Sequence, residues 1–317
     1  MRVIFMGTPQ FAAGVLDGIL NSKHTVTAVI TQPDRINARG NKSVPCAVKT
    51  LADAQNLPIF QFERIGTELG AIRAISKHAD IMVTAAYGQI LPQSVLDATK
   101  HGVINAHASI LPKYRGSSPV QWALINGEAE TGITIMRIVL KVDAGDVLLT
   151  KKISLSDIEN ADECLARLTP IAADAIVEAL DLIESGRAAF TPQDESQATT
   201  VRFLEKSDGL LDFSASALSV YNRVRGVFPW PGAFTPSPIG VLKFIKVAPV
   251  VNSIYDVVPT RAGTVIASSD IEGLIIKCGE GAVSVLTIQA ENAKAMPIAD
   301  FLRGKKIPVG TVLGEEI

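Results

Sequence analysis

The sequence has few of the features that mark secreted, metal-binding or membrane proteins. It contains three cysteines, Cys46, Cys164 and Cys278, which lie far apart and match no metal-ligand spacing, so we expect neither disulfides nor a metal. No apolar run approaches the ~18 residues of a membrane-spanning helix, and residues 1–5 predict a strand rather than a signal peptide. These absences favour a cytoplasmic protein without membrane contacts.

The net charge is also small. Charged residues make up 20% of the 317 residues and the net charge is -2, which excludes a basic coat over the whole surface. Any contact with nucleic acid must therefore be a local patch. The 47% hydrophobic content is ordinary for a globular protein, and the length predicts a large core divided between two domains.

One segment, residues 102–116, combines an amide, an imidazole, a hydroxyl and cations directly after an apolar strand. Asn105 and His107 are two residues apart, so on an extended backbone their side chains project from one face. They can therefore converge on one oxygen atom. Asp143 ends a second apolar run, and Gly145 allows a tight turn after it.

These residue types fit acyl transfer to an amine. The carbonyl oxygen becomes an oxyanion when nitrogen attacks, and Asn105 and His107 are candidates to stabilise it by hydrogen bonding. Asp143 is the candidate to hold the imidazole in one tautomer and to accept or relay the amine's proton, directly or through water. An alternative stays open, because Asn-x-His pairs arise by chance and a histidine near an apolar strand is often a satisfied core residue.

The longer string of residues 105–116 and 143–145 resembles the motif of the 10-formyltetrahydrofolate-dependent formyltransferases. The family's Asn, His and Asp map onto Asn105, His107 and Asp143. Ile110 replaces a usual Leu and Ala144 a common Thr, and neither change removes a catalytic group.

Within that superfamily, residues 5–12, 32–35 and 228–234 resemble the methionyl-tRNA formyltransferases. The resemblance implies that the methionyl α-amine of initiator tRNA attacks the formyl carbon of 10-formyltetrahydrofolate. One rival is a formyltransferase for a small amine, such as a nucleotide-linked amino sugar or glycinamide ribonucleotide. Another is a non-catalytic RNA-binding module that keeps a folate pocket. The basic loop and β-rich second half disfavour the first rival, and the intact Asn-His-Asp set disfavours the second.

The resemblance also implies a pocket for the flat pterin of folate, formed by backbone groups and an apolar wall after the strand at residues 81–85. The candidate lining residues are Tyr87, Gly88, Gln89, Ile90, Leu91, Ser109, Leu111 and Pro112. For Ile90 and Leu91, packing in the core is the simpler alternative. Lys113 and Arg115 are candidates to face either the glutamate tail of folate or RNA.

Residues 35–49 carry four cations and no acid, namely Arg35, Arg39, Lys42 and Lys49. A run of this kind is usually a solvated loop. It follows a predicted strand at the presumed site, however, where basic side chains can reach phosphates. The resemblance implies a loop that enters the tRNA acceptor stem, with Arg39 and Lys42 as the main candidates.

Short apolar strands alternate with helices through residues 1–186, which predicts a doubly wound, Rossmann-like α/β domain with a mostly parallel sheet. Its last helix is expected at residues 171–185. Residues 187–206 are polar and predict a linker with one short strand. Residues 207–317 contain short strands with glycine-rich turns, which predicts a small barrel; the resemblance implies an OB-like domain that binds tRNA in a monomeric enzyme.

Overall fold

The computed structural model describes residues 1–36, 43–250 and 259–314. Contacts divide the chain into two compact units. The first unit contains Met1–Pro119, Glu130–Ser154 and Leu165–Val201, and the second contains Val120–Ala129, Leu155–Cys164 and Arg202–Ile317. The second unit therefore includes two short segments that come from within the sequence range of the first unit.

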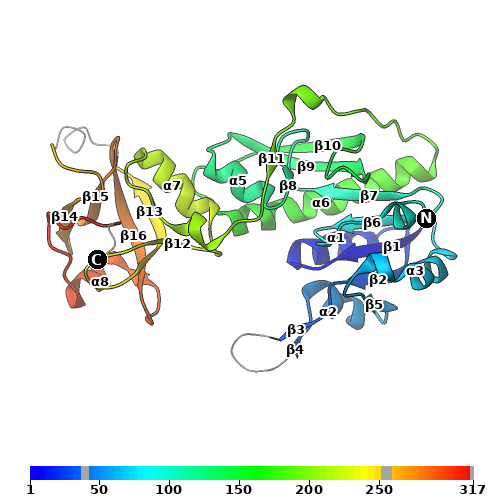
Figure 1. The fold of residues 1–317 in the computed structure, drawn as a ribbon, viewed down its shortest axis with the longest axis horizontal. Coiled ribbons are helices and arrows are strands. Elements are labelled where there is room, and N and C mark those ends of the chain that lie inside the picture. Colours follow the sequence, from blue (N-terminus) through cyan, green and yellow to red (C-terminus); the bar gives the residue numbers. More distant parts are fainter. Residues whose placement is uncertain (37–42, 251–258, 315–317) are drawn as a thin grey trace. The chain divides into compact units, whose positions relative to one another are not determined.

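The first unit contains a seven-stranded sheet in the order β10-β9-β7-β6-β1-β2-β5 (Figure 1). Its strands are β1 (Arg2–Gly7), β2 (Thr25–Thr31), β5 (Ile59–Gln61), β6 (Ile81–Ala85), β7 (Val103–His107), β9 (Glu130–Arg137) and β10 (Val147–Ser154). The five strands from β7 to β5 run parallel, while β9 is antiparallel to β7 and to β10. The predicted mostly parallel sheet is confirmed.

The central strand β1 is buried on both faces, which is why its sequence is continuously apolar instead of alternating. Ile4 and Met6 share one core cluster with Ile72 and Val95. The helices of this unit are α1 (Gln10–Leu20), α2 (Ala47–Ala54), α3 (Leu69–Ser76), α4 (Gln93–Leu96) and α6 (Ala161–Glu184, in this unit from Leu165 onward), with 3-10 turns η1 (Ile65–Thr67) and η2 (Glu195–Gln197). Helix α6 begins ten residues before the expected start.

The early start of α6 has a physical reason. Pro170 lies inside the helix, where it removes one backbone donor at a cost of ~3 kcal/mol. The side chains of Leu168, Ala172 and Ile176 on either side are completely buried, and this packing holds the helix through the proline. A prediction from local sequence alone treats the proline as a boundary.

The Gly7-Thr-Pro turn between β1 and α1 is set by packing. A Cβ atom on Gly7 would lie 2.7 Å from Ala12 Cβ and 2.8 Å from the carbonyl oxygen of Ala85. The close approach of α1 to the strand ends therefore requires glycine. Two short ribbons, β3 (Arg35–Ile36) with β4 (Ser43–Val44) and β8 (Arg115–Gly116) with β11 (Thr200–Val201), complete the unit.

The described residues of the second unit form an antiparallel sheet accompanied by helices (Figure 1). Its elements are α5 (Pro119–Ile125, with all but Pro119 in this unit), η3 (Lys206–Gly209), α7 (Ala217–Gly226), β12 (Ala233–Thr235), β13 (Leu242–Pro249), β14 (Val265–Ser269), β15 (Gly273–Lys277), β16 (Ala282–Ala290), β17 (Met296–Pro297) and α8 (Ile298–Gly304). The predicted second β domain is confirmed. Among the described residues, no ladder joins β12 to β14, so the sheet order is open where a closed barrel was expected.

No helix in the described ranges is both long enough and apolar enough to cross a membrane.

The core of the second unit forms around Phe213, Phe244, Ile276 and Ile288, each at most 4% exposed. Each unit thus has its own hydrophobic core.

An ion pair at the start of β1 makes stability depend on pH. Arg2 donates from its backbone N and from Nη2 to Asp80, each at 2.8 Å, and this lowers the pKa of Asp80 from 3.8 to about 2. A carboxyl group with a lowered pKa in the folded state stabilises the protein above its unfolded pKa and loses this effect as pH falls. We expect Asp80→Asn to lower the urea midpoint at pH 6. The difference from the parent protein should shrink between pH 4 and about pH 2, and a constant difference would contradict the account.

Candidate active site

Asn105 is the middle residue of β7 and His107 is its last, so both lie toward the carboxyl ends of the parallel strands, where such folds bind ligands. Its neighbour in register on β6 is Thr84, whose Oγ donates a 2.7 Å hydrogen bond to Asn105 Oδ1. This bond fixes the amide with its Nδ2 end as the donor. Thr84 was not identified from the sequence, although the predicted pairing of the two strand ends would have brought it beside Asn105.

His107 is 6% exposed, and each of its ring nitrogens has a polar neighbour. Nε2 lies 2.9 Å from the carbonyl oxygen of Tyr114. Because a carbonyl oxygen only accepts, Nε2 carries a hydrogen and donates it. Nδ1 lies 3.5 Å from Asp143 Oδ2, within ion-pair range.

Asp143 is held from two directions. Its Oδ2 accepts a 2.8 Å hydrogen bond from the backbone N of Gly116, and its own backbone carbonyl accepts one from Gln193 Nε2, also 2.8 Å. Its φ of 48° is left-handed, a conformation that costs a non-glycine residue about 1–3 kcal/mol. The predicted approach of Asp143 to His107 is thus present, whereas the contribution of Gln193 carried no recognisable sequence signal.

Arg115 was a candidate to face the glutamate tail of folate or RNA, and its guanidinium is instead buried against other side chains of the protein. It is 3% exposed, and its guanidinium donates to Gln193 Oε1 and to both carboxylate oxygens of Glu195 at 2.8 to 3.2 Å. Lys141 Nζ lies 2.6 Å from the same carboxylate. Hydrogen bonds from Arg115 and Lys141 lower the pKa of Glu195 from 4.5 to about 2, so Glu195 is an anion at neutral pH.

The candidate folate segment has a mixed environment. Tyr87 and Leu91 are 4% and 5% exposed within the core cluster behind β1, while Ile90 is 78% exposed. Burial raises the pKa of Tyr87 to about 12, and its hydroxyl finds no hydrogen-bond partner among the described residues. Gln89 donates to the carbonyl of Phe62 and accepts from the backbone N of Ile65, which joins this segment to η1. Gly88 has a left-handed φ of 88°.

The other folate candidates lie in the loop after β7. Ser109 is 2% exposed and donates to the carbonyl of Lys113 at 2.8 Å. Thr134 Oγ on β9 donates to the carbonyl of Ser109 and accepts from the backbone N of Leu111. Leu111 is 8% exposed and Pro112 is partly buried, so this side of the loop is apolar and anchored to the sheet.

The candidate RNA-binding cations have different environments. Arg35 is exposed on β3. Lys49 Nζ lies 2.6 Å from Asp34 Oδ2 and 3.0 Å from Gln61 Oε1, and the Asp34 carboxylate raises the pKa of Lys49. Arg39 and Lys42 lie outside the described residues.

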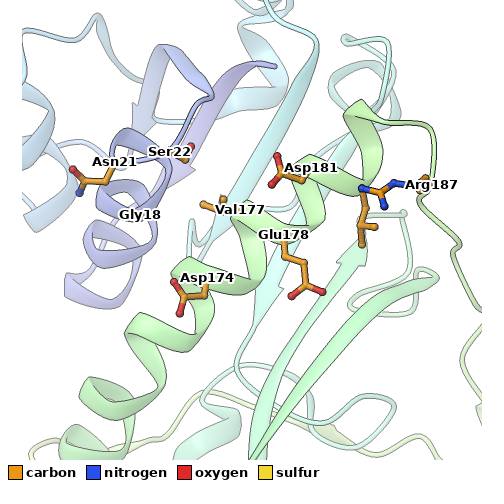
Figure 2. Close-up of a pocket in the computed structure, with 9 residues that line it drawn as sticks. Gly18, Asn21, Ser22, Asp174, Val177, Glu178, Asp181 and Arg187 are labelled. Carbon is orange, nitrogen blue, oxygen red and sulfur yellow. The ribbon is translucent and has the colours of Figure 1, made fainter.

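In the described part of the chain, one group of side chains has the proximity of metal ligands: His24, Asp181 and Glu184. Lys23 Nζ lies 2.8 Å from Asp181, and the Met1 ammonium lies 2.8 Å from Glu184, so ammonium groups already neutralise the carboxylates. Asp181 lines a groove between the end of α1 and α6 (Figure 2). The residues that line this groove do not include Asn105, His107 or Asp143.

The fold and the site define the class of protein. Residues 1–180 match the Formyl transferase family and residues 204–306 match Formyl transferase, C-terminal domain. An N-formyltransferase from Helicobacter canadensis, solved with folinic acid and dTDP-3-aminofucose, has a similar fold, with a TM-score of 0.66 at 16% identity over 90% of this chain and 98% of that one.

Relatives at higher identity narrow the class. The methionyl-tRNA formyltransferases of Geobacter sulfurreducens and Solibacter usitatus are each 41% identical over 317 residues, spanning 99% of this chain and 97% and 99% of theirs. The chain belongs to the methionyl-tRNA formyltransferase family. The resemblance seen in the sequence is confirmed.

The turn after Asp143 gives a test of how tightly this site is packed. A Cβ atom on Gly145 would lie 1.9 Å from the carbonyl oxygen of Arg137, a backbone atom that cannot move alone. We expect Gly145→Ala to lower the unfolding free energy by about 1–3 kcal/mol in urea titrations. Gly70→Ala is the matched control, because nothing lies within 4 Å of that position in α3 and alanine there should stabilise the helix by about 0.5–1 kcal/mol. Equal stability of Gly145→Ala and the parent would contradict the packing.

Proposed function

We propose that this protein transfers the formyl group of 10-formyltetrahydrofolate to the α-amino group of methionyl-initiator tRNA. The observation that carries the proposal is the 3.5 Å approach of Asp143 to His107, which is the last residue of β7 and lies two residues after Asn105, in a unit that matches the Formyl transferase family. The names of the 41% identical relatives support the acceptor, and the folinic acid of the fold neighbour supports a folate donor.

The reaction forms one carbon–nitrogen bond and breaks another. The methionyl nitrogen attacks the formyl carbon, whose oxygen becomes an oxyanion. The nitrogen then loses one proton, the bond from the formyl carbon to N10 of the folate breaks, and N10 gains one proton. The products are formylmethionyl-tRNA and tetrahydrofolate. A catalyst for this reaction therefore needs hydrogen-bond donors for the oxyanion and a group that takes up and returns a proton.

The three residues divide these tasks. Asn105 offers its Nδ2 hydrogens to the oxyanion, since Thr84 occupies the Oδ1 end of the amide. With Nε2–H bound to the Tyr114 carbonyl, His107 receives a proton at Nδ1, where the Asp143 carboxylate stabilises the resulting imidazolium. That positive ring then stabilises the oxyanion on the same face of β7. The Tyr114 carbonyl thus sets the tautomer of the neutral ring, and Asp143 forms part of the proton acceptor.

The proposed folate site keeps all the candidates from the sequence: Tyr87, Gly88, Gln89, Ile90, Leu91, Ser109, Leu111 and Pro112. Because Tyr87 and Leu91 are in the core, we assign their backbone groups to the pterin and their side chains to the wall behind it. The exposed Ile90 and the apolar side of the loop at Leu111 supply direct contact. We further propose a monomer that acts in the cytoplasm without a metal cofactor.

A formyl-transfer assay tests the function directly. Purified protein is incubated with 10-formyltetrahydrofolate and, in turn, methionyl-initiator tRNA, a nucleotide-linked amino sugar and glycinamide ribonucleotide. We expect formylation of the tRNA alone. Preference for a small amine would replace the proposed acceptor, and no transfer to any of them would contradict an enzymatic role.

Substitution of the proton acceptor gives a second test. If His107 and Asp143 act on charge that exists only in the transition state, His107→Ala and Asp143→Asn should each lower kcat by ~10²–10³ with little change in KM. Thr50→Ala, an exposed helix position, is the control. Wild-type turnover by either site variant across pH would remove that residue from the mechanism.

We also propose that Arg35, Arg39, Lys42 and Lys49 bind the acceptor tRNA, with Arg39 and Lys42 as the main phosphate contacts. Replacing Arg39 and Lys42 by Ala should raise KM for charged tRNA and reduce the log–log salt slope by about one unit for each phosphate that is no longer bound. The KM for folate should stay unchanged. The control is the double variant Lys151→Ala/Lys152→Ala. It removes the same amount of charge, from β10 lysines that are paired with Glu178 and Glu130. Weakened folate binding with intact tRNA kinetics would favour the small-amine alternative.

A further inference from the structure

Residues 190–201, which we call the strap, cross both loops of the candidate site although the sequence predicts a linker there. At the Asp143 loop, Thr191 and Val147 exchange two backbone hydrogen bonds of 2.8 Å. Gln193 Nε2 donates to the carbonyl oxygens of Asp143 and Gly145, at 2.8 and 2.7 Å. One amide group thus holds the backbone on both sides of the turn.

The other end of the Gln193 side chain is fixed as well. Its Oε1 accepts from Nε and Nη2 of Arg115 at 3.0 and 2.8 Å, and Arg115 is held in turn by Glu195. A guanidinium only donates and a carbonyl oxygen only accepts, so these neighbours determine the orientation of the Gln193 amide. Rotation of the amide by 180° would break all four hydrogen bonds.

The same strap holds the loop that contacts His107. The backbone N of Tyr114 donates to Thr199 Oγ at 2.8 Å, and that of Arg115 donates to the carbonyl of Thr199 at 2.9 Å. Strand β11 then pairs with β8, so closely that a Cβ atom on Gly116 would lie 2.2 Å from the carbonyl oxygen of Val201. Tyr114 binds Nε2 of His107, and Asp143 lies beside Nδ1. The two neighbours of the imidazole are therefore held by one segment.

We propose that Gln193 is a positioning residue for formyl transfer, which holds the Asp143 backbone so that the carboxylate stays beside Nδ1 of His107. This inference rests on the proposed function. Gln193 acts through Asp143 and contacts neither reacting group. Arg115 and Glu195 keep the Gln193 amide in the orientation that this role requires.

The first test is Gln193→Ala, which removes both donors to the turn. Misplacement of a catalytic group by about 1 Å can cost ~10²-fold in rate, so we expect kcat to fall by ~10–100-fold while the KM values for folate and tRNA stay within about 3-fold. Gln197→Ala is the matched control, because Gln197 lies in the same strap and its side chain donates to the exposed Asp194, away from the Asp143 turn. The control should keep the parent kcat.

A double-variant cycle separates positioning from a general structural role. If Gln193 acts only through Asp143, adding Gln193→Ala to Asp143→Asn should change kcat by less than about 3-fold, since the function of the carboxylate is already lost. Multiplied losses in the double variant would overturn the proposal. Single-turnover rates on folded protein, with thermal midpoints measured in parallel, give these values.

Gln193→Glu tests the positioning role of Gln193 if the alanine variant does not fold. It keeps an oxygen for Arg115, but it presents a second oxygen to the carbonyls of Asp143 and Gly145, where a donor is required. We expect a kcat loss at least as large as for Gln193→Ala, and the parent kcat in this variant would overturn the proposal. The parent protein is assayed alongside. An inactive parent contradicts the proposed function, whereas an active parent with unimpaired Gln193 variants contradicts only the positioning role.

Discussion

The hydrogen bond from His107 Nε2 to the Tyr114 carbonyl is the constraint on which the site depends. It leaves Nδ1 as the only ring nitrogen that can exchange a proton, and Asp143 lies 3.5 Å from it. Tyr114 makes this bond with a left-handed φ of 61°, a strained conformation that surrounding contacts must enforce. Thr199 supplies one such contact through its hydroxyl. A segment 85 residues away thereby determines the tautomer of the histidine.

The sheet supplies the rigid part of the same arrangement. β7 pairs with β6 on one side and β9 on the other, so Asn105 and His107 project from a strand held along both edges. The loop after β7 is tied to β9 through Thr134, which binds the backbone of both Ser109 and Leu111. Side chains on a rigid strand need no reordering when substrate binds, which favours a preorganised site for developing charge.

Local sequence patterns predicted the parts of the fold that depend on neighbouring residues. β6 has the expected bounds because it is a short run of β-branched and apolar residues. The spacing of Asn105 and His107 predicted their common face, and the resemblance predicted that Asp143 would join them. The contacts of Gln193 and the burial of Arg115 could not be predicted, because their hydrogen bonds join residues that are 48 to 80 positions apart in the sequence. A polar strap that binds backbone carbonyls has the composition of a linker.

The protonation pattern of the His107 ring tests the central claim most directly. Nitrogen-15 NMR of protein labelled at its four histidines, with His107 assigned by its loss in a substituted variant, reports which ring nitrogen carries hydrogen. The hydrogen bond to Tyr114 predicts hydrogen on Nε2 and none on Nδ1 in the neutral ring. A neutral ring with hydrogen on Nδ1 and none on Nε2 would contradict the account.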